Sequence, residues 1–92
     1  MDERIRDARK MAKRLINNYM GVRPNEEVLI VVDPATDMIM PEALAGATLE
    51  CGARYTIAVM PESVDGENAT TCTNIVAMGA KAADVYIGMT RS

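Results

Sequence analysis

The chain has 92 residues, of which 49% are hydrophobic and 3% aromatic, and its formal net charge is -3. Because domains commonly run to ~100–150 residues, this length predicts one domain or part of one. No apolar run approaches the ~18 residues of a membrane span, and Met1-Asp2-Glu3 lacks the basic and apolar regions of a signal peptide, so we expect a cytoplasmic protein with no membrane partner.

The first predicted element is a helix over residues 3–20. Its apolar residues recur at spacings of three and four from Ile5 to Tyr19, and charged residues fall on the other face. Gly21 follows the last apolar residue and can adopt the left-handed conformation that ends a helix, and Pro24 prevents the helix from resuming.

Most of the basic residues of the chain lie between Arg4 and Arg23. They alternate with acidic residues such as Asp7, and Tyr19 is their only aromatic neighbour that could stack on a base. We therefore interpret this cluster as a solvated helix face and expect no nucleic-acid partner.

A strand and a second helix come next. Residues 28–32 form a continuous run of branched apolar side chains closed by Asp33-Pro34, which is typical of a parallel strand covered on both faces. A helix over residues 40–51 follows, with Pro41 in its first turn. Proline lacks a backbone N–H, and N–H groups of the first turn make no hydrogen bond within the helix, so nothing is lost there.

The last three predicted elements are a strand over residues 55–60, a helix over residues 71–81 with its N-cap at Thr70 or Thr71, and a strand over residues 85–89. The two cysteines, Cys51 and Cys72, lie in the helical patterns and form no CxxC pair. We interpret both as reduced core thiols.

Helices that alternate with buried strands predict an α/β fold, a three-layer doubly wound sheet of three parallel strands and three helices with right-handed crossovers. We favour the strand order 2-1-3. Strand 85–89 would then be an uncharged edge, so we expect the fold to be incomplete without a further strand, from a longer chain or another subunit. This predicts a homo-oligomer, most simply a two-fold dimer, with Tyr86 and Ile87 as candidate interface residues.

Ligands of open parallel sheets bind beyond the carboxyl ends of the strands. The candidate ligand-binding residues at these ends are Asp33, Thr36, Glu62, Thr90 and Arg91. For Asp33, a role in capping the following turn competes with a role in binding. The chain has no histidine, no GxGxxG and no GKS or GKT motif, so we expect no catalytic residue, metal ligand or cofactor within it.

Several stretches together resemble a known family. They are residues 8–19 and 21–33, Glu42-Ala43-Leu44 with Cys51-Gly52-Ala53, and residues 82–88 with Thr90 and Ser92 after them. This combination is similar to the N-terminal domain of the metallo-aminopeptidase family that includes aminopeptidase T and aminopeptidase S. The same architecture occurs in the iron-dependent 2,5-dihydroxypyridine dioxygenases.

The resemblance implies a function that depends on a second domain. In that family the metal ligands belong to a C-terminal domain, so a divalent zinc, cobalt or iron ion would be bound outside this chain. The complete protein would remove N-terminal amino acids from a peptide substrate, and this domain would wall the cleft and contribute to subunit contacts. Two alternatives stay open: a free-standing oligomerisation or small-ligand-binding module without catalysis, and the N-terminal part of a ring-cleaving dioxygenase.

Overall fold

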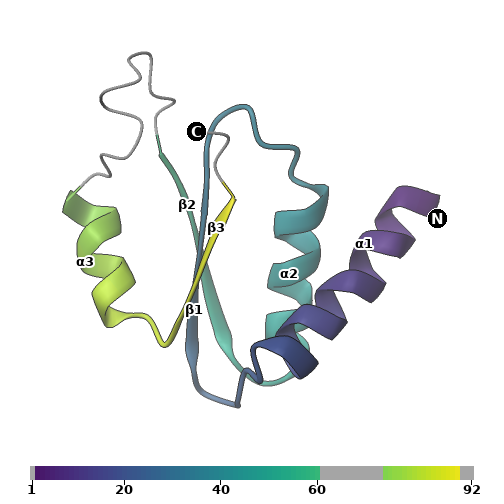
Figure 1. Cartoon of the computed structure of the whole chain (residues 1–92), viewed down its shortest axis with the longest axis horizontal. Coiled ribbons are helices and arrows are strands. Elements are labelled where there is room, and N and C mark those ends of the chain that lie inside the picture. The colour runs from purple at the N-terminus through teal and green to yellow at the C-terminus, as the bar shows by residue number, and fades with distance from the viewer. Residues whose placement is uncertain (1, 61–73, 90–92) are drawn as a thin grey trace.

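The computed structural model describes residues 2–60 and 74–89. Within these residues the chain forms an α/β fold whose three strands are parallel and follow the order β2-β1-β3 (Figure 1). The elements in chain order are α1 (Glu3–Arg14), a π-helical turn η1 (Leu15–Tyr19), β1 (Glu27–Val32), α2 (Ile39–Glu50), β2 (Arg54–Val59), α3 (Asn74–Ala82) and β3 (Val85–Met89). The predicted fold class and strand order are confirmed.

The helices divide unequally between the two faces of the sheet. Figure 1 shows α1 and α2 on one side of the strands and α3 on the other, for the part of the chain that the structure describes. Right-handed crossovers in a 2-1-3 sheet place α2 and α3 on opposite faces, and α1, which precedes β1, joins α2. Residues 71–73, the predicted N-cap at Thr70 or Thr71, and Cys72 lie outside the described residues.

The central strand is buried on both sides, as predicted. Val28, Ile30 and Val32 point into the core beneath α1 and α2. Leu29 and Val31 pack with Val76 beneath α3. Each of these five strand residues is at most 7% exposed, so the uninterrupted apolar run reflects a strand with helices on both faces.

The first helix differs from the prediction at its carboxyl end. Instead of a uniform α-helix to residue 20, the backbone widens at Leu15, whose carbonyl accepts a hydrogen bond from Met20 N at 2.8 Å. A π-turn holds more residues than an α-turn, so it rotates the last side chains off the apolar stripe. Ile16 is therefore fully buried while Tyr19 is 80% exposed. Gly21 ends the element with a φ of 57°, as expected.

The second strand corrects another expectation. Residues 55–60 were predicted to be buried on both faces, but β2 is exposed along much of its length, including 59% of Val59 and 41% of Tyr55. The reason is its position at the edge of the sheet. Only β1 lies beside it among the described strands, so its side chains lack neighbours on the outer side. Continuous apolar character does not distinguish a central strand from an edge strand.

The second helix matches the prediction closely. It begins at Ile39, one residue earlier than expected, and buries Leu44, Ala47 and Thr48 against the sheet and α1. Cys51 caps its end as a free, half-buried thiol that donates to the Thr48 carbonyl at 3.3 Å.

Candidate functional site

The turn after β1 occupies the carboxyl end of the central strand, where we expected a site. Asp33 is only 5% exposed, and one of its carboxylate oxygens accepts a hydrogen bond from Ala35 N at 2.9 Å. The Thr36 N–H closes the turn by donating to the Asp33 carbonyl at 3.1 Å. The structure thus confirms that the Asp33 carboxylate caps this turn.

The Thr36 hydroxyl connects the same turn to the far strand. Its Oγ1 accepts from Asp33 N at 3.0 Å and lies 3.0 Å from Asp33 Oδ1 and 3.1 Å from the Met89 carbonyl oxygen. A hydroxyl carries a single proton, so Thr36 can donate to only one of these two acceptors at a time. When the proton points to the Met89 carbonyl, Thr36 ties the loop after β1 to the last residue of β3, across the point where the strand order reverses. When it points to Asp33 Oδ1, the hydroxyl closes the turn instead. The sequence places Asp33 and Thr36 in one turn as candidate binding residues, but it indicates neither their mutual hydrogen bonds nor the contact with Met89, because a backbone carbonyl leaves no signal in the sequence.

The other predicted site residues are not brought together with this turn in the described part of the chain. Glu62, Thr90 and Arg91 lie outside the described residues. Tyr86 and Ile87 point to opposite faces of β3: Ile87 packs against the core beneath α1 and α2, and Tyr86 is 48% exposed on the α3 side. Within residues 2–60 and 74–89, no group of three or more acidic or cysteine side chains is placed to hold a metal ion.

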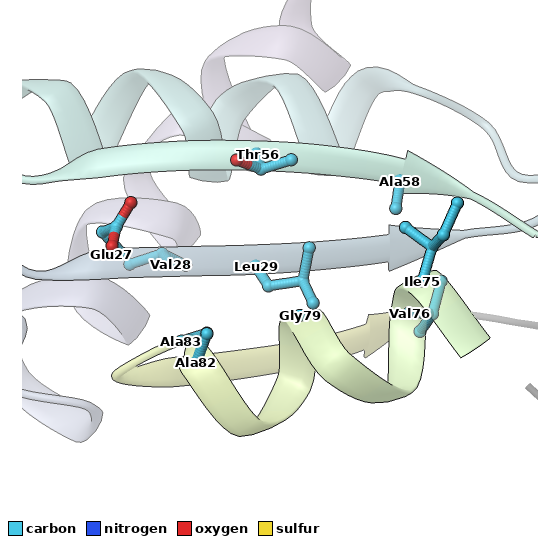
Figure 2. A pocket seen from close by; sticks show the side chains of 10 residues that line it. All are labelled: Glu27, Val28, Leu29, Thr56, Ala58, Ile75, Val76, Gly79, Ala82 and Ala83. Atoms are coloured by element: carbon cyan, nitrogen blue, oxygen red, sulfur yellow. The ribbon is translucent and has the colours of Figure 1, made fainter. Parts of the chain in front are cut away.

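An apolar groove lies on the α3 side of the sheet, and the sequence did not predict it. It has a volume of about 220 Å³ and runs between α3 and the face of β2 (Figure 2). Leu29 of β1 forms its floor, and Thr56 and Ala58 line it from β2. The residues that line it from α3 and the following connection are Ile75, Val76, Gly79, Ala82 and Ala83.

The groove exists because small side chains face each other across it. Gly79 comes so close to the sheet that a Cβ there would stand 3.3 Å from Leu29 Cδ2. Thr56 and Ala58 are too short to fill the space beside α3. Small residues at facing positions of a strand and a helix are the signal that could have indicated this groove.

A second, polar hollow of about 470 Å³ lies between α1 and α2. Arg9 and Lys13 line it from α1, and Glu42 and Glu50 line it from α2. Lys13 Nζ lies 3.6 Å from Glu50 Oε2, and both side chains are about 60% exposed. Such a hollow with exposed charges of both signs agrees with the predicted solvated helix face.

Comparisons of the chain with protein-family models, with curated proteins and with solved structures found no match. In the described part of the chain, none of the helices is both long enough and apolar enough to cross a membrane.

Proposed function

We propose that this chain is the non-catalytic N-terminal α/β domain of an aminopeptidase-like metalloenzyme. The complete protein would remove N-terminal amino acids from peptides with a divalent zinc, cobalt or iron ion bound by residues outside this chain. The present domain would form one wall of the substrate cleft and take part in contacts between subunits.

The observation that carries the proposal is the closed turn at the carboxyl end of β1. In an open parallel sheet this is the usual ligand position. Here the Asp33 carboxylate and the Thr36 hydroxyl are engaged with each other, with the turn backbone and with the Met89 carbonyl. Polar groups used in this way shape and rigidify an edge of the sheet, which suits a cleft wall that supports chemistry performed elsewhere.

A second observation supports the family resemblance. Two of the stretches that carry it, residues 21–33 and Cys51-Gly52-Ala53, meet at the amino end of the sheet. Asn25 N donates to the Gly52 carbonyl at 2.9 Å, and a Cβ on Gly52 would stand 3.4 Å from Pro24 Cβ. With φ at 81°, Gly52 adopts a conformation that other residues rarely take. These two stretches therefore form one structural unit that includes a position with a strict glycine requirement.

The groove beside α3 favours one alternative, a free-standing module that assembles or binds a small apolar ligand without catalysis. Its lining is mostly aliphatic, with Glu27 and Thr56 as the polar residues, and it lies away from the Asp33 turn. Such a module would keep the same fold and would have no need of a metal-binding domain.

The decisive experiment is to sequence the encoding gene beyond the codon for Ser92 and to assay the protein that it encodes. We expect a longer frame rich in glutamate and histidine, whose protein releases the N-terminal residue of an aminoacyl nitroanilide only when zinc, cobalt or iron is added. The 92-residue chain alone, with the same metals, should release nothing. Metal-dependent release by the short chain would contradict the proposal. A stop codon after Ser92 would favour the free-standing module. Iron-dependent cleavage of a dihydroxypyridine ring by the longer protein would favour the dioxygenase.

A further inference from the structure

One end of the groove beside α3 carries a charge, and the rest of the groove is largely apolar. Glu27 begins β1 and lies on the same face of the sheet as Leu29, two residues later, and both line the groove (Figure 2). Among the described residues that line it, Glu27 is the only charged one, and Thr56 is the only other one with a polar side chain. A groove of this kind suits a ligand that is apolar along its length and polar at one end.

The Glu27 carboxylate is available to such a ligand. The backbone of Glu27 is fixed, because its N–H donates to Asp84 Oδ2 at 2.8 Å and its carbonyl accepts from Asp84 N at 2.9 Å. The side chain is exposed, and its carboxylate forms neither a hydrogen bond nor an ion pair with the residues that the structure describes. The strand therefore holds Glu27 in place without using its charge.

The charges around Glu27 favour a cation. Arg54 is the register partner of Glu27 on β2, so both side chains lie on the same face of the sheet, yet Arg54 does not line the groove. Asp84 adds a second carboxylate at the start of β3. These two carboxylates and one guanidinium sum to a net negative charge at this end of the groove. Lys81, the basic residue of α3, follows the buried Val76 by five residues and so lies on the far side of the helix.

The dimensions of the groove set the length of the ligand. Figure 2 places Glu27 at one end and Ile75 with Val76 at the other, with Leu29 and Gly79 between them. The volume of about 220 Å³ holds about seven heavy atoms, if each occupies the ~30 Å³ of a water molecule in the liquid. An unbranched chain of about six carbons with one terminal nitrogen fills this volume.

We propose that the groove binds a primary alkyl ammonium ion of about six carbons, with its nitrogen at Glu27 and its chain along Leu29 and Gly79 toward Val76. An alkylamine is protonated at neutral pH, like the lysine side chain with its pKa of ~10.4. The inference rests on the groove and its one carboxylate. It applies equally to a free-standing module and to a domain of a longer enzyme, and its test does not measure peptide cleavage.

Titrations of the full chain, followed by the NMR signals of its backbone amides, test the proposal. The probes are hexylamine, 1-hexanol and hexanoate at pH 7, which share a chain length and differ in charge. We expect hexylamine to shift the amides of Thr56, Gly79 and Ala82 saturably, with a dissociation constant on the order of 1 mM. Hexanol should bind about fivefold more weakly, and hexanoate more weakly still, because the carboxylate attracts the first probe and repels the last. No saturable binding, or equal affinity for all three probes, would overturn the proposal. Tighter binding of hexanoate would also overturn it and would point to Arg54.

Glu27→Gln isolates the charge from the shape of the groove. It should weaken hexylamine about fivefold, to the affinity of hexanol, and leave hexanol unchanged. The matched control is Glu42→Gln, which removes an exposed carboxylate from α2 on the other side of the sheet and should change neither affinity (Figure 1). A Glu27→Gln variant that still prefers hexylamine over hexanol would overturn the assignment of the nitrogen to this carboxylate.

Thr56→Leu tests whether the ligand occupies the groove itself. Thr56 is exposed, and a leucine there fills space beside α3, so the variant should lose binding of both hexylamine and hexanol. The amide spectrum of each variant reports whether the chain remains folded, and Ala82→Leu, which fills the groove from α3, replaces Thr56→Leu if that variant unfolds. A folded variant with a filled groove and unchanged affinity for hexylamine would place the ligand elsewhere and overturn the proposal.

Discussion

The two faces of the sheet share the same central strand but differ in how they are covered. Beneath α1 and α2, alternate residues of β1 join Ile16 and Leu44, both at most 1% exposed, in a large buried cluster. Beneath α3, Leu29 and Val31 meet a single buried residue of the helix, Val76, in the described part of the chain. The strand is equally apolar toward both faces, so the number and position of the helices, and not the sequence of the strand, set the depth of each core.

The largest expected effect lies on the two-helix face. Leu44→Ala should lower the free energy of unfolding by about 3 kcal/mol, because it deletes a side chain that is 1% exposed and leaves a cavity between two helices and the sheet. Denaturant unfolding at one fixed protein concentration measures this, since any self-association makes apparent stability depend on concentration. Leu49→Ala is the control from the same helix. At 57% exposure, it should change the unfolding free energy by less than about 0.5 kcal/mol.

A matched pair on β1 tests the comparison directly. Val31 and Val32 are both fully buried but face α3 and the two-helix core, respectively. Val32→Ala should cost about 2 kcal/mol and Val31→Ala about 1 kcal/mol, because the thin layer beneath α3 can collapse more easily around the space of the two lost methyl groups. Equal costs in denaturant unfolding would show that the α3 face is as tightly packed as the other.

The sequence predicted those features that depend on the pattern of a single segment. The run Val28 to Val32 indicated a central strand, and Pro41 placed the start of α2 to within one residue. Strand order followed from chain order and handedness. These inferences use local periodicity and general rules of topology, which a single sequence contains.

The features that the sequence missed depend on contacts between distant segments or on small changes in helix geometry. The π-turn at Leu15 changes the backbone of one turn, whereas the spacing of apolar residues there is still typical of an α-helix. The exposure of Val59 follows from the edge position of β2, and the bond between Thr36 and Met89 joins two backbone segments fifty-three residues apart. For the candidate site, the capping of the turn by Asp33 was predictable from turn chemistry. The groove beside α3 was not, since it depends on how closely Gly79 approaches Leu29.

The carboxyl end of the sheet should show a moderate effect. Asp33→Ala removes the acceptor for Ala35 N and for the Thr36 hydroxyl, so we expect a loss of about 1 kcal/mol in unfolding free energy. Asp33→Asn keeps an oxygen acceptor and should recover most of that loss. If Asp33→Ala unfolds like the unmodified chain but no longer binds some small ligand, the carboxylate belongs to a binding site and the capping account is wrong.

The smallest effect should come from the ion pair between α1 and α2. Lys13 and Glu50 are mostly exposed and 3.6 Å apart, whereas the fully buried Ala12 and Ile16 already hold α1 in place by packing. A double-mutant cycle with Lys13→Ala and Glu50→Ala should give a coupling energy below about 0.5 kcal/mol, because water screens exposed charges and fixing two long side chains costs entropy. The coupling should shrink further in ~1 M salt, where the screening length falls to ~3 Å. A coupling above ~1 kcal/mol that persisted in salt would mean that charge, and not apolar packing, attaches α1 to the two-helix face, and the contrast between the two faces would then need a different cause.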